Sequence, residues 1–489
     1  MVRESRREFV PLALVAVAAF VLATTKVTSS DAWVHLSLGR WIARSRRVPT
    51  RNLISYTEPE RPTLDHQWLF QLSFYGVERA VALEGAIVLK ALLVAAAFAL
   101  GCRAALSSGA RPGVALVVGI IAACAARFRF TLRPQIVSFL LLSGYLLLLG
   151  DWRSGRRWPL LLAIPLQVLW ANFHGGAAVL GFGLVLVFAF GETVSALVAR
   201  RWKRQAVGAG ALALLWSVGI GCCLATLANP HGARILALPF THALTQATSG
   251  LKELLLDRSA VTIGELGGRH VFLAILAPLV VVAMGVEVVR FRFGHSFFLL
   301  GLLVGAFASE RFIGLLAVAA AHLAPEPLTR VLERLGKRSL GLPGAVAVGC
   351  VAVLIAVALV GRDQPFGLGV ARGMFPEREL EAIRARFPRA RLLNEFEDGG
   401  YIHWKTERQV FVDSRGLLAY SPAFMLDYVG MWTSREIWER MVSRYGVEVA
   451  LVWREPLKAM FRSSPEWREV FVEGGNGRHA VFARVIPQR

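Results

Sequence analysis

Asp31 is a candidate catalytic residue because of its place in the chain. It follows the first long apolar run, in Ser29-Ser30-Asp31-Ala32-Trp33-Val34-His35, and is therefore expected at a membrane surface. A carboxylate there could be a general base that accepts a proton from an acceptor hydroxyl or amine. Ser-Asp before an amphipathic segment is also a common helix N-cap, and the residues alone favour the cap.

A second acid, Asp65, lies in Thr63-Leu64-Asp65-His66-Gln67-Trp68. A carboxylate beside an imidazole could hold a metal or work as an acid/base pair. Neighbouring residues on a helix point about 100° apart, so Asp65 and His66 are not expected to share one ligand by themselves. Asp65 could equally cap the helix that follows it.

Four arginines are candidates for binding phosphate or pyrophosphate: Arg127, Arg129, Arg133 and Arg311. The first three crowd a short hairpin on the side where the positive-inside rule does not place cations, so they need a reason to be there. The alternative is that they snorkel to lipid phosphates. Glu310-Arg311 divides two short apolar runs, as an internal ion pair or as a ligand contact.

Histidines complete the set of candidate site residues: His35, His66, His174 and His231. For His174, a hydrogen-bonded interfacial histidine is the default interpretation. The five cysteines all lie in apolar stretches and have no zinc spacing, so no metal site is assigned. No cofactor is predicted; a divalent metal is compatible with the outer acids but is not indicated by them.

Composition indicates the solvent in which these residues must be positioned. The 489 residues are 55% hydrophobic and 18% charged, with a mean hydropathy of +0.51. Such values are typical of a polytopic membrane protein and exclude disorder. The formal charge of +21 comes from basic residues in short loops, so it is interpreted as a topology signal and nucleic acid is not a predicted partner.

Apolar runs long enough for the bilayer core predict about eleven transmembrane helices. They lie near 9–25, 84–106, 113–129, 135–150, 159–172, 176–197, 206–228, 270–289, 295–308, 311–325 and 342–361. Four alternate loops are basic: Arg153, Arg156, Arg157; Arg200, Arg201, Lys203, Arg204; Arg290, Arg292; and Arg330, Arg334, Lys337, Arg338. These loops predict a cytoplasmic N-terminus and an extracytoplasmic C-terminal region.

The loops predicted on the outer side are longer and richer in aromatic and ionisable residues. The first, residues 27–83, holds two amphipathic pieces, Asp31–Arg44 and Asp65–Ala80, which suit helices lying in the headgroup layer. Another, at about 229–268, holds Asn229-Pro230-His231-Gly232. Function is therefore expected on the outer face.

A composition shift at Arg362 predicts two domains, a transmembrane domain over residues 1–361 that includes the first outer loop, and a soluble domain over 362–489. Helices are predicted over Met374–Phe387 and from Thr433-Ser434-Arg435-Glu436 to Arg444. Strands are predicted over Arg391–Phe396, Gln409–Asp413 and Val447–Trp453, with a hairpin over Val470–Val485. The order predicts a small α/β domain.

This pattern resembles the GT-C superfamily of integral-membrane glycosyltransferases and, within it, a bacterial group of predicted GT-C-like membrane proteins. The resemblance is carried by Asp31–Leu36, Gly39–Ile42, Val48-Pro49, Ser55–Thr57, Asp65–Leu69, Trp170–Gly176, Asn229–Gly232, Gly399–Trp404 and Val410–Arg415. It implies a GT-C-like fold in the bacterial cytoplasmic membrane. It also implies sugar transfer from a polyprenyl-phosphate-linked donor to a lipid, glycan or protein acceptor at the outer face.

In GT-C enzymes the first-loop acid is catalytic, which the resemblance carries over to Asp31, with Asp65 in reserve. Many members have paired acids there, whereas this chain has Ser30-Asp31-Ala32, a departure that favours a metal-independent mechanism. Two other classes stay open. One is an oligosaccharyltransferase or glycan ligase, loosely supported by Glu397-Asp398-Gly399-Gly400-Tyr401; the other is a non-enzymatic transporter or scaffold.

Overall fold

The computed structural model describes residues 2–202, 207–248, 251, 260–336, 341–360 and 364–485. Its contacts divide the chain into two compact units. The helical unit comprises Met1–Lys26, Val81–Pro239 and Leu255–Gly369; the mixed unit comprises Val27–Ala80, Phe240–Leu254 and Val370–Arg489. The predicted cations Lys203, Arg204, Lys337 and Arg338, and the predicted boundary at Arg362, lie outside the described residues.

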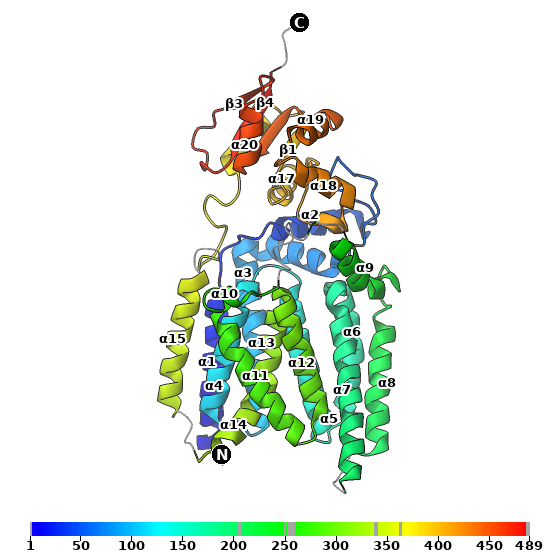
Figure 1. The fold of residues 1–489 in the computed structure, drawn as a ribbon, viewed down its shortest axis with the longest axis vertical. Helices are drawn as coiled ribbons and strands as arrows, with labels where there is room; N and C mark the ends of the chain where they lie inside the picture. Colours follow the sequence, from blue (N-terminus) through cyan, green and yellow to red (C-terminus); the bar gives the residue numbers. More distant parts are fainter. Residues whose placement is uncertain are drawn as a thin grey trace. The chain divides into compact units, whose positions relative to one another are not determined.

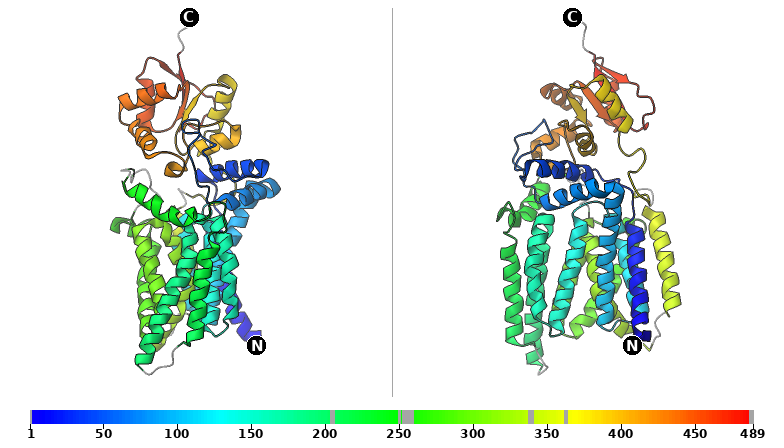
Figure 2. Two further views of the ribbon diagram at one scale, coloured as in Figure 1. Left: turned by 90° about the vertical axis from the view of Figure 1, so that its right-hand side faces the viewer. Right: turned by 180° about the vertical axis from the view of Figure 1, so that it is seen from behind.

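Helices make up most of the helical unit, and many of them lie side by side in all views (Figures 1 and 2). They are α1 (Val2–Ala23), α4 (Pro112–Ala126), α5 (Gln135–Arg153), α6 (Ala163–Phe173), α7 (Gly175–Arg201), α8 (Ala209–Ala225), α11 (Val271–Val289), α12 (Phe293–Ala308), α13 (Ile313–Leu323), α14 (Pro325–Arg334) and α15 (Leu342–Val360). The short elements between them are η1 (Arg127–Arg129), η2 (Trp158–Leu162), α10 (Ile263–Leu266) and η5 (Glu310–Phe312). Two further helices, α3 (Trp68–Ser107) and α9 (Arg234–Thr248), belong partly to each unit.

Five described helices are long and apolar enough to cross a membrane, and a bent pair over Glu310–Arg334 makes a sixth candidate. Five more apolar helices are shorter: Phe9–Ala23, Trp158–Phe173, Ala209–Ala225, Phe293–Ala308 and Leu342–Ala358. Helix formation satisfies the backbone polar groups that lipid cannot. The polytopic membrane class is therefore confirmed, while the predicted total of eleven spans stays a prediction.

Helix α3 contains a break where the chain passes from one unit to the other. Val81 has φ −136° and ψ 19°, and Ala82 has φ 57° and ψ −178°, so the helical hydrogen bonds cannot continue through them. The residues before the break belong to the predicted amphipathic piece Asp65–Ala80, and those after it to the predicted span 84–106. The sequence-based separation into two helices therefore agrees with the break in α3.

The mixed unit contains a four-stranded sheet of order β1-β2-β4-β3. β1 (Leu392–Asn394) runs parallel to β2 (Val449–Val452), whereas β4 (Ala480–Arg484) is antiparallel to both β2 and β3 (Trp467–Val470). The helices of the unit are α2 (Asp31–Ser45), the first part of α3, α16 (Glu377–Arg386), α17 (Gly399–Thr406), η6 (Gly416–Leu418), α18 (Pro422–Gly430), α19 (Arg435–Arg444) and α20 (Glu455–Arg462). The predicted mixture of helices and strands is confirmed for this region.

The predicted strand over Gln409–Asp413 is wrong. Val410 forms only an isolated bridge with Ser55, because its backbone N–H donates to the Ile54 carbonyl and its own carbonyl accepts from Tyr56. The segment therefore pairs with the first loop instead of with the sheet. Its side chains still enter the core: Phe411 and Val412 are fully buried.

These pairings explain a difference between the structure and the sequence-based division. The sequence assigned the whole first loop to the transmembrane domain, whereas the contacts place Val27–Ala80 in one unit with Val370–Arg489. Besides the Ser55–Val410 bridge, the Glu58 carboxylate accepts hydrogen bonds from the Ser421 backbone N–H and hydroxyl, at 2.7 and 2.6 Å. The loop is thus packed and hydrogen-bonded as part of a folded unit.

Candidate functional site

Asp31 is the first residue of α2 and is half-buried. Ser30 occupies the N-cap position, although its side chain makes no capping hydrogen bond. The cap interpretation of Asp31 therefore does not describe its position: the carboxylate belongs to the first turn, where the helix dipole favours negative charge. The Asp31 carboxylate therefore lies at the N-terminal end of α2, in its first turn.

The start of α2 is held by the C-terminal part of the mixed unit. A β-carbon on Gly400, at the beginning of α17, would lie 3.1 Å from the Ser30 carbonyl oxygen, so only glycine allows the helices to approach so closely. The Trp33 ring packs edge-on against Phe375 and Tyr401, with centroid distances of 5.4 and 5.1 Å. The residues that carry the family resemblance near 31 and near 399–404 therefore contact one another.

Asp65 lies immediately before α3 and is 9% exposed. Its Oδ1 accepts a hydrogen bond from Gln71 Nε2 at 2.8 Å and a longer one from the Gln67 backbone N–H at 3.4 Å. Burial raises the pKa of Asp65 to about 6, although these hydrogen bonds and the charge of Arg415 act in the opposite direction. A buried carboxyl with this pKa changes charge near neutral pH.

The charge that acts on Asp65 belongs to a buried polar network. Arg415 donates to both carboxylate oxygens of Asp413, at 2.8 and 2.7 Å, and to Asn52 Oδ1 at 2.5 Å. The Tyr420 hydroxyl donates to Asp413 Oδ2 at 2.7 Å. Although burial alone would raise the pKa of Asp413, Arg415 and these hydrogen bonds lower it. Asp413 and Arg415 thus form a structural ion pair that joins the first loop to the C-terminal region.

The candidate histidines of the first loop are largely packed. His35 is 6% exposed, and its ring lies edge-on to Phe70 at 5.2 Å. His66 is 8% exposed, with Nδ1 3.3 Å from the Leu64 carbonyl oxygen and Nε2 3.0 Å from Gln67 Nε2. His35 and His66 are thus packed within the mixed unit, and His66 is also hydrogen-bonded.

The four candidate arginines belong to the helical unit, whereas Asp31 and Asp65 belong to the mixed unit. Arg127 and Arg129 form the ends of η1 and are 1% and 6% exposed. Arg127 Nη2 donates to the Gln364 carbonyl at 3.3 Å, and Arg129 Nη2 donates to Gln135 Oε1 at 2.7 Å. Their burial disfavours snorkelling, which needs an exposed head group.

The side chain between these two arginines, Phe128, contacts the cluster that precedes Arg311. The Phe128 ring lies 5.1 Å from the His270 ring, and His270 Nε2 is 3.0 Å from Glu310 Oε1. Arg269 forms a 3.5 Å ion pair with the same Glu310 oxygen. The fold therefore brings η1, the start of α11 and η5 together within the helical unit. Sequence analysis named the arginines of η1 and η5 as candidates but did not predict that these segments meet.

This cluster also contains a group of residues that could hold a metal ion. Glu265, His270 and Glu310 each offer one ligand atom, and these atoms all lie within 4.8 Å of one another. Carboxylate and imidazole ligands suit Zn²⁺ and other first-row divalent ions. Sequence analysis missed the group because 40 residues separate His270 from Glu310. In this structure the His270 ring and the Glu310 carboxylate are hydrogen-bonded to each other.

His174 and His231 belong to two motifs that lie close together in the helical unit. His174 Nδ1 is 2.8 Å from the Ser138 hydroxyl, which also accepts from Trp170 Nε1 at 2.9 Å. The His231 backbone N–H donates to Asn229 Oδ1 at 2.7 Å, within a turn. The Asn172 side chain donates to the carbonyl of Ala228, the residue before the second motif, at 2.8 Å. Both motifs thus have structural contacts.

Sequence analysis missed a buried acid, Glu395, at the end of β1. Its Oε1 accepts from the backbone N–H groups of Trp453 and Arg454, at 2.5 and 2.6 Å, and burial raises its pKa to about 7. The Arg454 guanidinium carbon lies 4.3 and 4.5 Å from the ring centroids of Trp432 and Trp453. Glu395 follows β1, and Trp453 and Arg454 follow β2. Because these strands are parallel, their carboxyl ends meet at one sheet edge, and this pairing is the feature that could have indicated the contact.

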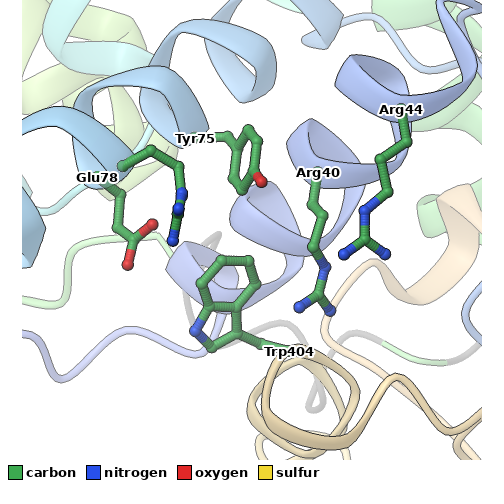
Figure 3. Close-up of a pocket in the computed structure, with 6 residues that line it drawn as sticks. Arg40, Arg44, Tyr75, Glu78 and Trp404 are labelled. Carbon is green, nitrogen blue, oxygen red and sulfur yellow. The ribbon is translucent and has the colours of Figure 1, made fainter.

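A second missed feature is a pocket of about 330 Å³ in the mixed unit (Figure 3). Three arginines, two aromatic residues and one acid line it: Arg40, Arg44, Arg79, Tyr75, Trp404 and Glu78. They come from α2, α3 and α17, elements that are joined only in the folded unit. No single stretch of sequence contains the arrangement.

No family model and no curated protein matches the sequence. Solved structures do match it. The archaeal oligosaccharyltransferase AglB from Archaeoglobus fulgidus, in complex with an inhibitory peptide and a dolichol-phosphate, has a TM-score of 0.61 and 11% identity; the match covers 94% of this chain and 72% of AglB. ArnT from Cupriavidus metallidurans, bound to undecaprenyl phosphate, has a TM-score of 0.55 and 12% identity, with 98% of both chains covered. The predicted GT-C-like fold is thereby confirmed over nearly the whole chain.

Proposed function

We propose that this protein is a membrane glycosyltransferase that transfers a sugar from a polyprenyl-phosphate-linked donor to an acceptor. The observation that carries the proposal is the match of fold between this chain and ArnT, which covers 98% of both chains. ArnT was solved with undecaprenyl phosphate bound. AglB was solved with a dolichol-phosphate. The two lipids are both polyprenyl-type phosphates, so a donor of that class is the simplest ligand for the shared fold.

Asp31 is the proposed general base. It is half-buried in the first turn of α2, whereas Asp65 is 9% exposed and engaged by Gln71. A base must reach the acceptor, so Asp31, the more accessible of the two acids, takes this role. Asp65 is the reserve acid and lies within the packed unit. In the proposed reaction Asp31 removes a proton from an acceptor hydroxyl or amine. The freed electron pair attacks the anomeric carbon, and the sugar–phosphate bond breaks.

The departing phosphate needs cations, and we assign that role to Arg127, Arg129, Arg133 and Arg311. Guanidinium groups bind phosphate through paired charge-assisted hydrogen bonds. The burial of Arg127 and Arg129 favours this role, because a desolvated cation interacts more strongly with developing negative charge. The proposed location is the bacterial cytoplasmic membrane, which the family resemblance implies, and the basic loops predict that the C-terminal region lies on its outer face.

Turnover and binding of a radiolabelled polyprenyl-phosphate sugar pool by the detergent-purified chain test the proposal. Wild type should consume a donor lipid. Asp31→Asn should lose transfer by a factor of about 10²–10⁴ yet still bind the donor, because only the proton acceptor is removed. Asp151→Asn is the matched control: Asp151 lies in the last turns of α5 and pairs with Arg156 at the surface. Transfer retained in Asp31→Asn would remove Asp31 from the mechanism.

An oligosaccharyltransferase or glycan ligase is the second candidate, favoured by the AglB match. The two functions differ in product, because an oligosaccharyltransferase moves a whole glycan. Mass spectrometry of the acceptor therefore decides between them: addition of one sugar supports the first, and a protein carrying an oligosaccharide supports the second. Failure of both wild type and variant to bind any lipid-linked sugar would favour a transporter or scaffold.

A further inference from the structure

The pocket in the mixed unit is lined by side chains from three helices (Figure 3). Arg40 and Arg44 project from successive turns of α2, whereas Tyr75, Glu78 and Arg79 come from α3. Trp404 of α17 closes one side. The volume of the pocket, about 330 Å³, is in the range of small-ligand sites. Three guanidinium groups and one carboxylate line the pocket, so cations outnumber anions in its lining.

Arg40 is held rigidly at this pocket. Its guanidinium carbon lies 4.5 Å from the Trp404 ring centroid, and Nη2 donates to the His403 carbonyl at 3.3 Å. Glu407 pairs with Arg40 at 3.3 Å and with Arg44 at 3.0 Å, so one carboxylate serves two cations. A guanidinium that is already oriented loses little freedom on binding a further anion, which favours bidentate contact with carboxylate or phosphate.

Arg79 adds a cation from the other helix. It is exposed, and no ion pair links it to another of the residues that the structure describes. It therefore brings positive charge to the lining without a carboxylate that neutralises it.

The other lining groups favour a ring with hydroxyls. Tyr75 and Trp404 lie nearly perpendicular, 6.2 Å between centroids, and supply the apolar faces on which a sugar ring can pack. Glu78 Oε2 is buried and accepts no hydrogen bond from the residues that the structure describes. A carboxylate oxygen without donors is costly when buried, and sugar hydroxyls are suitable donors.

We propose that this pocket binds a sugar bearing a carboxylate or a phosphate. The arginines take the anionic group, Glu78 accepts from ring hydroxyls, and the aromatic residues pack against the ring. A phosphatidylglycerol head group could supply phosphate to the same arginines, but it lacks the ring that the aromatic faces and Glu78 match. The role of this sugar as part of the acceptor rests on the proposed glycosyltransferase function; the binding itself does not.

Calorimetric titration of the detergent-purified full chain, without donor lipid, tests the site. Glucuronate and glucose 6-phosphate should bind about tenfold more tightly than glucose. One additional charge-assisted hydrogen bond lowers the free energy of binding enough to change the Kd by about that factor. Arg79→Gln should weaken binding of both anionic sugars about tenfold, and Trp404→Leu should weaken all three sugars. Arg378→Gln is the control, since Arg378 is an exposed arginine of α16 in the same unit.

Equal affinity for charged and neutral sugars, or wild-type affinity in Arg79→Gln, would overturn the proposal. A second arm tests the lipid source, by native mass spectrometry of chain extracted from phosphatidylglycerol nanodiscs. Retention of this lipid by wild type but not by Arg79→Gln, with no sugar binding, would assign the site to a head group instead. Turnover of the donor lipid is measured in a separate assay. If wild type turns over the donor but does not bind the sugars, the inference about the pocket is overturned and the proposed glycosyltransferase function is not.

Discussion

Gly400 lies so close to Val34 that a β-carbon built on it would be 2.7 Å from the Val34 Cγ2 atom. Such a separation is well inside van der Waals contact, and the backbone N of Val34 would be only 3.0 Å away. The contact lies one turn after Asp31, so the C-terminal region helps to set the direction of the helix that carries the proposed base.

Gly400→Ala should therefore destabilise the mixed unit by about 1–3 kcal/mol, the usual cost of overpacking. Because α2 must shift to relieve the clash, sugar transfer should fall more than donor binding does. Thermal unfolding and the transfer assay measure the two effects. Gly76→Ala is the matched control in α3, where an added β-carbon meets nothing within 4 Å and alanine favours the helix. Equal behaviour of the two variants would show that the close approach has no consequence.

Asp65 should make stability depend on pH. Its pKa is raised to about 6 in the folded protein from 3.8, so between these values the folded state binds a proton that the unfolded state has lost. Stability should therefore fall as the pH rises from about 4 to 6, by on the order of 3 kcal/mol, and then level off. Comparing melting temperatures of wild type and Asp65→Asn from pH 4 to 7.5 isolates this contribution. A constant difference across that range would contradict the raised pKa.

The buried Asp413–Arg415 pair should be sensitive to loss of one partner. Arg415→Gln leaves the fully buried Asp413 carboxylate without its cation, which should cost about 3–5 kcal/mol. Arg435→Gln removes an exposed partner of Glu439 in the same unit and should cost less than about 1 kcal/mol. Denaturant or thermal unfolding of the full chain compares them. Similar losses in both variants would mean that the buried pair is not special.

Arg129 should contribute to catalysis through the donor phosphate. Arg129→Gln should lower kcat for transfer by about tenfold to a hundredfold, since one charge-assisted contact to the leaving group is lost. Arg129→Lys keeps the charge but not the planar fork, and should recover part of the rate. Arg156→Gln, at an exposed arginine beside Asp151, should leave transfer unchanged. An unchanged rate in Arg129→Gln with an intact melting profile would exclude the phosphate role.

Much of the local structure follows from the sequence by itself. The predicted piece Asp31–Arg44 is α2, Thr433–Arg444 corresponds to α19, and the apolar runs correspond to helices of the helical unit. Ser434 caps α19, with its side chain accepting from the Ile437 N–H, so the N-cap lies one residue after Thr433, where the predicted capping box placed it. Helices depend on residues three and four apart, so the apolar period and the capping residues are sufficient signals.

The tertiary structure alone decided which segments meet. Gln409–Asp413 has the pattern of a strand, yet it pairs with the first loop through Val410 and Ser55. Asn52 reaches Arg415 across 363 residues of sequence, and the pocket needs Arg40, Tyr75 and Trp404 at once. Such contacts join residues that no local period relates, and they form only when distant elements bury a common surface. That is why the helices were predictable from the sequence, whereas the pocket and the buried network of Asp413 and Arg415 near Asp65 were not.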